Sequence, residues 1–187
     1  MIAFAMCGSY CTHHAALEQL QVLKNQGEEI VPVFSENVWR TDTRFGTAEV
    51  LQEKVRKLCD HPIVHTIPDA EPFGPKIPLE MLIICPCTGN TLAKIAAGIT
   101  DTPVTMAAKA QMRQGRPILI ALSTNDGLGT NLYNLALLLN KKNVFFVPLL
   151  QDDPAKKPFS LSADFKKLPI ALEAARRGEQ LRPLFCM

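Results

Sequence analysis

Small polar residues are concentrated in four short segments, each of which directly follows an apolar run. These four polar segments cover residues 8–12 (GSYCT), 35–37 (SEN), 86–91 (PCTGNT) and 123–131 (STNDGLGTN). Glycine lets the backbone approach a ligand closely, and hydroxyl groups beside the free N–H groups of a helix start favour a bound anion. These residue types predict a site for a ligand that carries a phosphate, such as a nucleotide.

Each polar segment also has a purely structural interpretation. Ser9 or Thr12 could cap the helix that follows, and Asn90 could do the same in its own segment. Residues 35–37 could form a simple turn. Residues 123–131 could be an elaborate turn with a cap, although loops this polar are often binding loops. The segments favour one common site only if they meet, which requires that the strands before them end at one edge of a sheet.

The spacing of apolar residues predicts the elements that position these segments. Short apolar runs predict buried strands at residues 2–6, 30–34, 81–85, 118–122 and 144–147, with a weaker strand at 63–67. We expect residues 144–147 to be the last strand. Apolar residues at helical spacing predict helices at about 16–26, 50–58, 92–96, 104–112, 132–139 and 164–177. Irregular structure is expected at residues 35–46, around the prolines at 68, 72, 75 and 78, and at 152–158.

The order of these elements predicts the fold class. Strands alternate with helices almost throughout, and the strands are apolar along their length, as expected when helices cover both faces of a sheet. Right-handed crossovers then give a doubly wound, mostly parallel sheet, a Rossmann-like α/β fold. A chain of 187 residues suits one domain that spans residues 1–187. Ligands of such sheets bind beyond the carboxyl ends of the strands, where the polar segments lie.

Composition and charge argue against several other classes of protein. The net charge is +2, and no block of Lys and Arg is longer than two residues, which argues against a nucleic-acid surface. No segment approaches the about 20 apolar residues of a membrane span, and the N-terminus has no charged signal-peptide region, so we expect a cytoplasmic protein. The sequence has no GxGxxG, GxxxxGK[ST] or GxSxG motif, which argues against a standard NAD site, a P-loop and a hydrolase elbow.

The cysteines are expected to be thiols, as in other cytoplasmic proteins. Cys7, Cys11, His13 and His14 lie close together in the sequence, but CxxxC followed by two adjacent histidines is not a standard zinc spacing. Adjacent histidines at a helix start also point about 100° apart. We therefore expect no metal site.

Residues 86–94 (PCTGNTLAK) and 96–104 (AAGITDTPV) carry a resemblance to a known family. They resemble the P-x-x-x-N-T-x-x-K-x-A-x-G-x-x-D segment of the flavin-dependent cysteine decarboxylases, whose superfamily includes the flavin prenyltransferases. The GSYCT and SEN segments match the phosphate and isoalloxazine loops of that superfamily. The resemblance covers nearly the whole chain and implies a flavoprotein fold with FMN as the cofactor.

A more specific resemblance is to the B subunits of dipicolinate synthases. It is carried by residues 43–46 (TRFG), 70–80 (AEPFGPKIPLE), 100–113 (TDTPVTMAAKAQMR), 123–131 and 151–158 (QDDPAKKP). It implies a subunit of an oxidoreductase that converts a dihydropyridine dicarboxylate to pyridine-2,6-dicarboxylate in the mother cell of a sporulating bacterium. It also implies a partner, the A subunit of dipicolinate synthase, with its own NAD(P)-binding domain, and a homo-oligomer built from trimers.

Two departures from the wider superfamily argue against its other activities. Cysteine decarboxylases have a histidine in the helical region after the second strand, whereas residues 43–59 contain none and His61 comes too late. Prenyltransferases have an arginine where this sequence has Ser123. Two alternatives to a dipicolinate synthase subunit stay open. One is a stand-alone FMN-dependent decarboxylase-like or prenyltransferase-like enzyme, and the other is a non-catalytic assembly subunit.

The resemblance and the polar segments together assign candidate cofactor residues. The FMN phosphate is expected at Gly8, Ser9, Thr12, Ser35 and Asn90. The ribityl chain and the ring are expected at Thr88, Ser123, Thr124 and Asn125.

A dicarboxylate substrate calls for cationic partners. Arg44, in the loop after the second strand, is the first candidate because a guanidinium binds a carboxylate in bidentate fashion. The second choices are Lys76, Lys109, Arg113, Lys156 and Lys157. The structural alternative is an exposed helix face for Lys109 and Arg113 and a solvated turn for Lys156 and Lys157. Asp126, Asp152 and Asp153 stay open as general bases, so the sequence assigns no catalytic residue.

Overall fold

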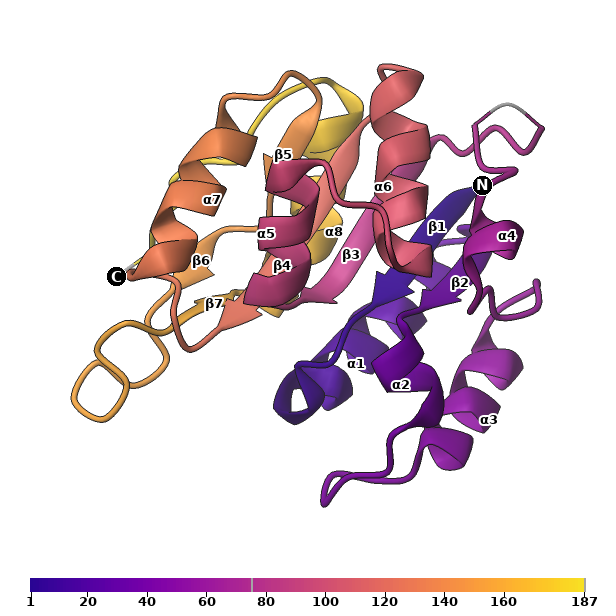
Figure 1. Cartoon of the computed structure of the whole chain (residues 1–187), viewed down its shortest axis with the longest axis horizontal. Helices are drawn as coiled ribbons and strands as arrows, with labels where there is room; N and C mark the ends of the chain where they lie inside the picture. The colour runs from indigo at the N-terminus through magenta and orange to yellow at the C-terminus, as the bar shows by residue number, and fades with distance from the viewer. Residues whose placement is uncertain (75, 187) are drawn as a thin grey trace.

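Seven strands form one mixed sheet in the computed structural model, which describes residues 1–74 and 76–186 (Figure 1). Five parallel strands make up its centre in the order β2-β1-β3-β4-β5. Their bounds are β1 Ile2–Met6, β2 Ile30–Phe34, β3 Met81–Cys87, β4 Ile118–Thr124 and β5 Val144–Phe146. The predicted α/β class with a mostly parallel sheet is confirmed.

Helices cover both faces of this sheet. One layer consists of α1 (His13–Asn25), α3 (Ala48–Leu58) and α8 (Leu168–Arg176), and the other of α5 (Gly89–Ala97), α6 (Pro103–Arg113) and α7 (Thr130–Leu139). Every residue of β1, β2, β3 and β5 is buried. Burial on both faces explains why these strands are apolar throughout rather than alternating.

Two short antiparallel strands extend the sheet beyond β4. β6 (Leu149–Leu150) pairs with β7 (Leu161–Ala163), and β7 pairs with Ser123 and Thr124 at the end of β4. The prediction that residues 144–147 form the last strand is therefore wrong. Strands of two and three residues are too short to show a periodic pattern in a sequence.

Residues 63–67 do not form the predicted weak strand. Val64 makes a single parallel bridge to β2, and the chain then turns into the short helix α4 (Ile67–Ala70). Thr66 Oγ1 caps this helix by accepting a backbone hydrogen bond at 3.2 Å. Pro68 occupies the first turn, where its missing N–H has no cost, so it helps to begin a helix there instead of breaking one.

Two other segments also differ from the prediction. α2 (Glu36–Arg40) occupies part of residues 35–46, because the Oγ of Ser35 accepts a hydrogen bond from the first turn and caps it. The last helix is preceded by a 3-10 turn, η2 (Phe165–Lys167). Pro75, which was expected to interrupt regular structure, lies outside the described residues.

Arg176 ties the last helix to two distant parts of the chain at the amino edge of the sheet. Its guanidinium donates hydrogen bonds to Glu28 at 2.7 Å, to Glu80 at 2.7 Å and to Glu173 at 2.6 Å. Replacing Arg176 by Met should lower the free energy of unfolding by about 1–3 kcal/mol, because three carboxylates would lose their shared cation. Thermal or urea unfolding measures this loss.

Arg177→Met is the matched control for that variant. Arg177 pairs with Glu179, and both side chains are largely exposed, at 60% and 63%. Exposed pairs of this kind contribute about 0–1 kcal/mol. An equal loss of stability in the two variants would contradict the role given to Arg176.

Candidate functional site

The four polar segments lie at the carboxyl ends of β1, β2, β3 and β4, where the β3 and β4 segments include the last two residues of their strands. They lie together at the carboxyl edge of the sheet, the lower edge in Figure 1. We refer to them by the strand that precedes them. Ser9 Oγ donates a hydrogen bond to the carbonyl oxygen of Ser123 at 2.7 Å and joins the β1 and β4 segments. Thr91 Oγ1, in the β3 segment, donates to Cys7 Sγ at 3.4 Å. The N–H of Ser35 donates to the last residue of β1 at 3.1 Å, so the β2 segment is joined as well.

The β3 and β4 segments lie close together at Gly89. A Cβ atom on this glycine would lie 2.6 Å from Thr124 Oγ1 and 2.5 Å from Asn131 Nδ2, closer than such atoms pack. A larger residue would force the side chains of Thr124 and Asn131 to shift, so glycine lets α5 begin close to the β4 segment.

The β1 segment differs from the β2 and β3 segments because neither of its hydroxyls caps a helix. A 3-10 turn, η1 (Tyr10–Thr12), leads into α1, and neither start has a side-chain cap hydrogen bond. Thr12 Oγ1 donates instead to the carbonyl oxygen of Ser9 at 2.8 Å. The positive end of the α1 dipole is therefore not matched by a capping acceptor, which is the arrangement that suits a phosphate.

Ser35 and Thr88 cap their helices. The cap of the β3 segment is therefore Thr88 and not Asn90, and residues 35–37 begin a helix where a simple turn was the structural alternative. Ser35 Oγ accepts from Val38 N at 3.4 Å, and Thr88 Oγ1 accepts from Thr91 N at 3.1 Å. A capping hydroxyl uses its oxygen as acceptor, so its hydrogen can still donate elsewhere. The Ser35 hydroxyl hydrogen has no acceptor among residues 1–74 and 76–186 and can donate to an anion, whereas that of Thr88 is directed to Thr91 Oγ1 at 3.0 Å.

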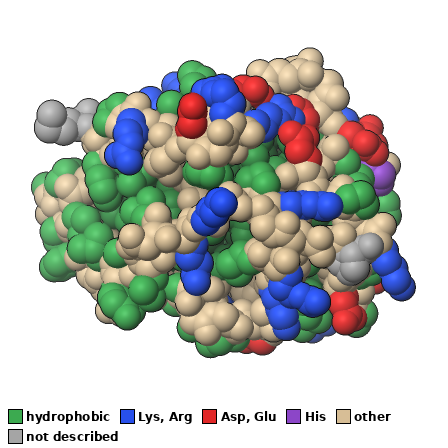
Figure 2. Space-filling view, turned by 90° about the horizontal axis from the view of Figure 1, so that it is seen from above, with side chains coloured by type: hydrophobic (Ala, Val, Ile, Leu, Met, Phe, Trp, Pro, Cys, Tyr) green, Lys and Arg blue, Asp and Glu red, His purple; other side chains and the backbone are tan. Residues whose placement is uncertain are grey.

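The candidate substrate residues do not gather in one place. Arg44 is exposed in the loop between α2 and α3, where its guanidinium carbon lies 4.9 Å from the centre of the Phe45 ring. Lys76 precedes β3 and Lys109 lies in the second half of α6, so both lie toward the amino edge of the sheet. Figure 2 shows this opposite edge, over which Lys and Arg side chains are scattered without forming one patch. Within this chain, Arg44 alone of the three lies on the side of the polar segments.

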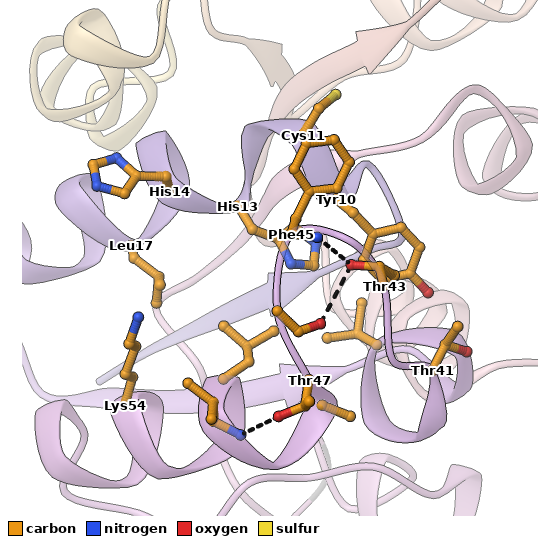
Figure 3. Close-up of a pocket in the computed structure, with 15 residues that line it drawn as sticks. Tyr10, Cys11, His13, His14, Leu17, Thr41, Thr43, Phe45, Thr47 and Lys54 are labelled. Carbon is orange, nitrogen blue, oxygen red and sulfur yellow. Dashed lines mark hydrogen bonds between the residues drawn. The ribbon is translucent and has the colours of Figure 1, made fainter.

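A cavity of about 160 Å³ lies beside the β1 segment, between the starts of α1 and α3 (Figure 3). Its wall includes Tyr10 and His13 on one side and Thr43 and Phe45 on the other. The Tyr10 hydroxyl donates to the carbonyl oxygen of Asn37 at 3.1 Å and so links the β1 and β2 segments. Typical cofactor pockets measure about 300–1,000 Å³. This cavity therefore accommodates part of a cofactor or a small ligand, and the surface at the polar segments stays open.

The sequence pattern did not assign Tyr10 or His13 to a ligand site, and His13 was considered only as a metal ligand. Tyr10 follows the candidate residue Ser9 directly in the β1 segment, which is the signal that points to Tyr10, whereas His13 comes just after this segment. The burial of His13 depends on packing under η1, for which the sequence has no pattern.

His13 makes the stability of the chain sensitive to acid. It is buried at the start of α1, and its Nε2 donates to the carbonyl oxygen of Cys7 at 2.8 Å. Burial lowers the pKa of His13 below its usual 6.5, against the smaller opposing effect of this hydrogen bond. The unfolded chain therefore takes up a proton at a higher pH than the folded chain. Stability should fall as the pH drops through about 6.5, until the folded pKa is reached.

His13→Gln should remove this part of the pH dependence. Thermal unfolding at pH 7.5 and pH 5.5 measures it in both proteins. The wild-type chain should lose more stability on acidification than the variant. An equal loss would show that His13 is not the group that titrates.

Cys7, Cys85 and Cys87 are buried thiols below the polar segments. Burial raises the pKa of Cys7 to about 11 and also raises the pKa of Cys85 and of Cys87. These thiols stay protonated at neutral pH and are poor nucleophiles.

Among the described residues, no group of three or more His, Cys, Asp or Glu side chains is placed to hold a metal ion. None of the helices in the same part of the chain is long and apolar enough to cross a membrane.

Residues 47–148, more than half of the chain, match the family model of the flavoproteins. The B subunit of dipicolinate synthase from Bacillus subtilis (strain 168) is 45% identical over 183 residues, which are 98% of this chain and 92% of that protein.

Two solved structures are similar to this chain in their fold. The B subunit of dipicolinate synthase from Bacillus halodurans C is 42% identical, with a TM-score of 0.91 over 100% of this chain and 95% of that one. A dodecameric FMN-dependent UbiX-like decarboxylase from Escherichia coli O157:H7 is 24% identical, with a TM-score of 0.63 over 79% of each chain. The second likeness is one of fold alone.

Proposed function

Because this chain belongs to the flavoprotein family and groups with the dipicolinate synthase B subunits, we propose that it is the flavin-binding subunit of a dipicolinate synthase. In this role it takes part in the oxidation of a dihydrodipicolinate-type precursor to pyridine-2,6-dicarboxylate during sporulation, in the cytoplasm of the mother cell. The observation that carries the proposal is the meeting of the four polar segments at one edge, together with the uncapped start of α1.

The polar segments offer groups of the kind that FMN needs. Its phosphate would lie at the start of α1, among Gly8, Ser9, Thr12, Ser35 and Asn90. The ribityl chain and ring would lie along Thr88, Ser123, Thr124 and Asn125. The amides of Asn90 and Asn125 are exposed and can reach a ligand. When bound, the flavin supplies a two-electron acceptor, and the residues of this chain bind and orient it.

The open form of the site supports an assembly of several chains. The cavity beside the β1 segment is smaller than a cofactor, so a neighbouring chain is expected to cover the rest of the flavin. α7 also leaves Leu132, Tyr133 and Leu137 exposed at 42%, 69% and 38%. Apolar side chains gathered on one helix favour a protein interface. We propose a trimer-based homo-oligomer that works with the A subunit of dipicolinate synthase, which carries the NAD(P) site.

Arg44 stays the first candidate for a substrate carboxylate, because it lies on the side of the polar segments. Lys76 and Lys109 would reach a substrate only at the site of a neighbouring chain. In the reconstituted enzyme, Arg44→Ala should raise the KM for the dicarboxylate precursor about tenfold, as expected for the loss of a charge-assisted hydrogen bond. Unchanged kinetics would remove Arg44 from the site.

Reconstitution tests the proposed function directly. The A subunit, this chain and the mixture of both are assayed for dipicolinate, each with and without FMN and a nicotinamide cofactor. We expect product to form fastest in the mixture and to depend on added FMN. If the A subunit reaches the same rate without this chain, the chain has only an assembly role and no part in catalysis. Turnover by this chain alone would favour a stand-alone enzyme.

A further inference from the structure

The loop between α2 and α3, residues 41–47, forms a fixed wall of the cavity beside the β1 segment. Thr43 and Gly46 exchange two backbone hydrogen bonds, at 3.0 and 3.1 Å, which close the loop into a tight turn. Gly46 has a φ of 139°, a conformation that favours glycine. The Asp42 carboxylate accepts a hydrogen bond from Ala48 N at 2.8 Å and joins the loop to the start of α3. These bonds fix the course of the loop around the cavity.

The opposite wall of the cavity is fixed by hydrogen bonds as well. The Tyr10 hydroxyl donates to the carbonyl oxygen of Asn37 at 3.1 Å, and His13 Nε2 donates to that of Cys7 at 2.8 Å. The rings of Tyr10 and His13 lie against each other, with their centroids 5.1 Å apart. Figure 3 shows the Phe45 side chain extending from the opposing loop toward this wall. The cavity is therefore preformed between two fixed walls, as is usual for small-molecule sites.

The volume of the cavity fits one ring and excludes the ring system of a flavin. The cavity measures about 160 Å³, and a cavity of about 150 Å³ holds a single benzene ring. The fused rings of FMN are too large for such a space. Its lining includes the apolar or aromatic side chains of Tyr10, Val38, Phe45 and Leu51. The cavity therefore suits one planar six-membered ring whose charged substituents stay at the opening.

The charge of the lining favours an anion. Among the described residues, no Asp or Glu side chain lines the cavity. Lys54 of α3 does line it, and its ammonium group takes part in none of the ion pairs formed by residues 1–74 and 76–186. Arg44 lies next to the lining residue Phe45, with its guanidinium carbon 4.9 Å from the centre of that ring. Carboxylates on a bound ring would therefore meet cations and no like charge.

We propose that this cavity binds the ring of the dicarboxylate substrate, a single planar ring that carries carboxylate groups. The ligand class rests on the function proposed above. The ring would pack against Tyr10 and Phe45, and its carboxylates would face the edge of the cavity, where Lys54 and Arg44 lie. The cavity adjoins the β1 segment, which is the proposed place of the flavin phosphate. Substrate and cofactor would then occupy neighbouring sites, and the fixed walls would select the substrate by the size of its ring.

Ligand size tests the cavity in the wild-type chain. Pyridine-2,6-dicarboxylate has one ring, whereas naphthalene-2,6-dicarboxylate has two fused rings and the same charge. Each is titrated calorimetrically into the chain in the presence of excess FMN. The one-ring ligand should bind at least about tenfold more tightly, because a second ring would have to displace the walls. Equal affinities, or no binding of the one-ring ligand, would overturn the proposal.

Two substitutions in the walls test the place of the ring. Ala48→Leu adds an isopropyl group to a lining residue and should weaken binding of pyridine-2,6-dicarboxylate at least about tenfold, because it fills part of the space. Phe45→Ala removes a ring contact and should weaken binding about three- to tenfold. Wild-type affinity in either folded variant would overturn the proposal. Phe45 is 55% exposed, so its variant keeps the test decisive even if Ala48→Leu does not fold.

Phe185→Ala is the matched control for Phe45→Ala. Phe185 is 52% exposed and pairs with β6, outside the lining of the cavity. Its affinity for pyridine-2,6-dicarboxylate should equal that of the wild-type chain. A loss as large as that of Phe45→Ala would contradict a site at the cavity.

Titration of FMN into the same proteins separates this proposal from the function on which it rests. The flavin is assigned to the polar segments outside the cavity, so folded Ala48→Leu should bind FMN as tightly as the wild-type chain. If this variant loses FMN, the cavity holds part of the flavin, and the substrate proposal fails while the flavin function stands. If the wild-type chain binds the one-ring dicarboxylate but not FMN, the flavin function fails and the dicarboxylate site stands.

Discussion

Thr12→Asp should weaken FMN binding by about 100-fold while the fold stays intact, because the new carboxylate would lie beside the flavin phosphate. Thr12 is the N-cap residue of α1, and Asp is at least as good an N-cap as Thr, so the helix start is kept or strengthened. Two like charges about 5 Å apart repel by about 3 kcal/mol at an effective dielectric constant of ~20. Titration of FMN with the apoprotein, followed by flavin fluorescence, measures the affinity.

Thr12→Asn is the matched control for this substitution. Asn has the shape of Asp and caps helices equally well, but it carries no charge. It should bind FMN within about fivefold of the wild type, and the difference between the Asp and Asn variants should shrink as salt is added. Equal FMN affinities of the two variants would show that the phosphate does not lie at the start of α1.

Gly127→Ala should lower the free energy of unfolding by about 1–3 kcal/mol, as expected for overpacking in a close contact. A Cβ atom on Gly127 would lie 2.5 Å from Leu161 Cβ and 2.7 Å from Leu161 Cγ. Leu161 is the first residue of β7 and is paired with Thr124 of β4. The Leu161 side chain cannot move away without disturbing this pairing and the base of the loop between β6 and β7, residues 151–160. Thermal unfolding should show a decrease of about 2–4 °C per kcal/mol for a chain of this size.

Gly8→Ala is the corresponding control for stability. A Cβ atom on Gly8 would meet Tyr10 Cε2 at 3.5 Å, an ordinary contact distance. Its stability should change by less than about 0.5 kcal/mol. If the two alanine variants lose stability equally, close packing of β7 on Gly127 is not what fixes the β4 segment.

The parallel centre of the fold could be predicted from the sequence because its strands are buried on both faces. Their apolar runs are continuous, and each ends where polar residues begin. β4 continues to Thr124, two residues beyond the predicted end, because Ser123 and Thr124 pair with β7. This pairing joins residues far apart in the chain, and neither the polar end of β4 nor the three-residue β7 has a local pattern that reveals it.

The location of the candidate site followed from topology, but its details did not. Parallel strands bring their carboxyl ends to one edge, so the meeting of the polar segments was predictable. The bond from Ser9 to Ser123 depends on side-chain geometry across the sheet. The position of Lys109 follows from topology, because α6 runs back to the amino edge before β4 and carries this residue away from the polar segments of its own chain.

The absence of a histidine in α3 still separates this chain from cysteine decarboxylases. α3 covers Ala48–Leu58 and has the sequence AEVLQEKVRKL. The histidines beside the cavity are His13 and His14, and both come from α1. His13 is buried and donates to a backbone carbonyl, so it serves the local structure of the β1 segment.

Binding of FMN to the purified chain tests the central claim most directly. The apoprotein is mixed with excess FMN, passed over a gel-filtration column and examined by visible absorbance. We expect a yellow protein that retains about one FMN per chain and loses the flavin when Thr12 is replaced by Asp. If all the flavin elutes separately from a folded protein, the four polar segments do not form a flavin site.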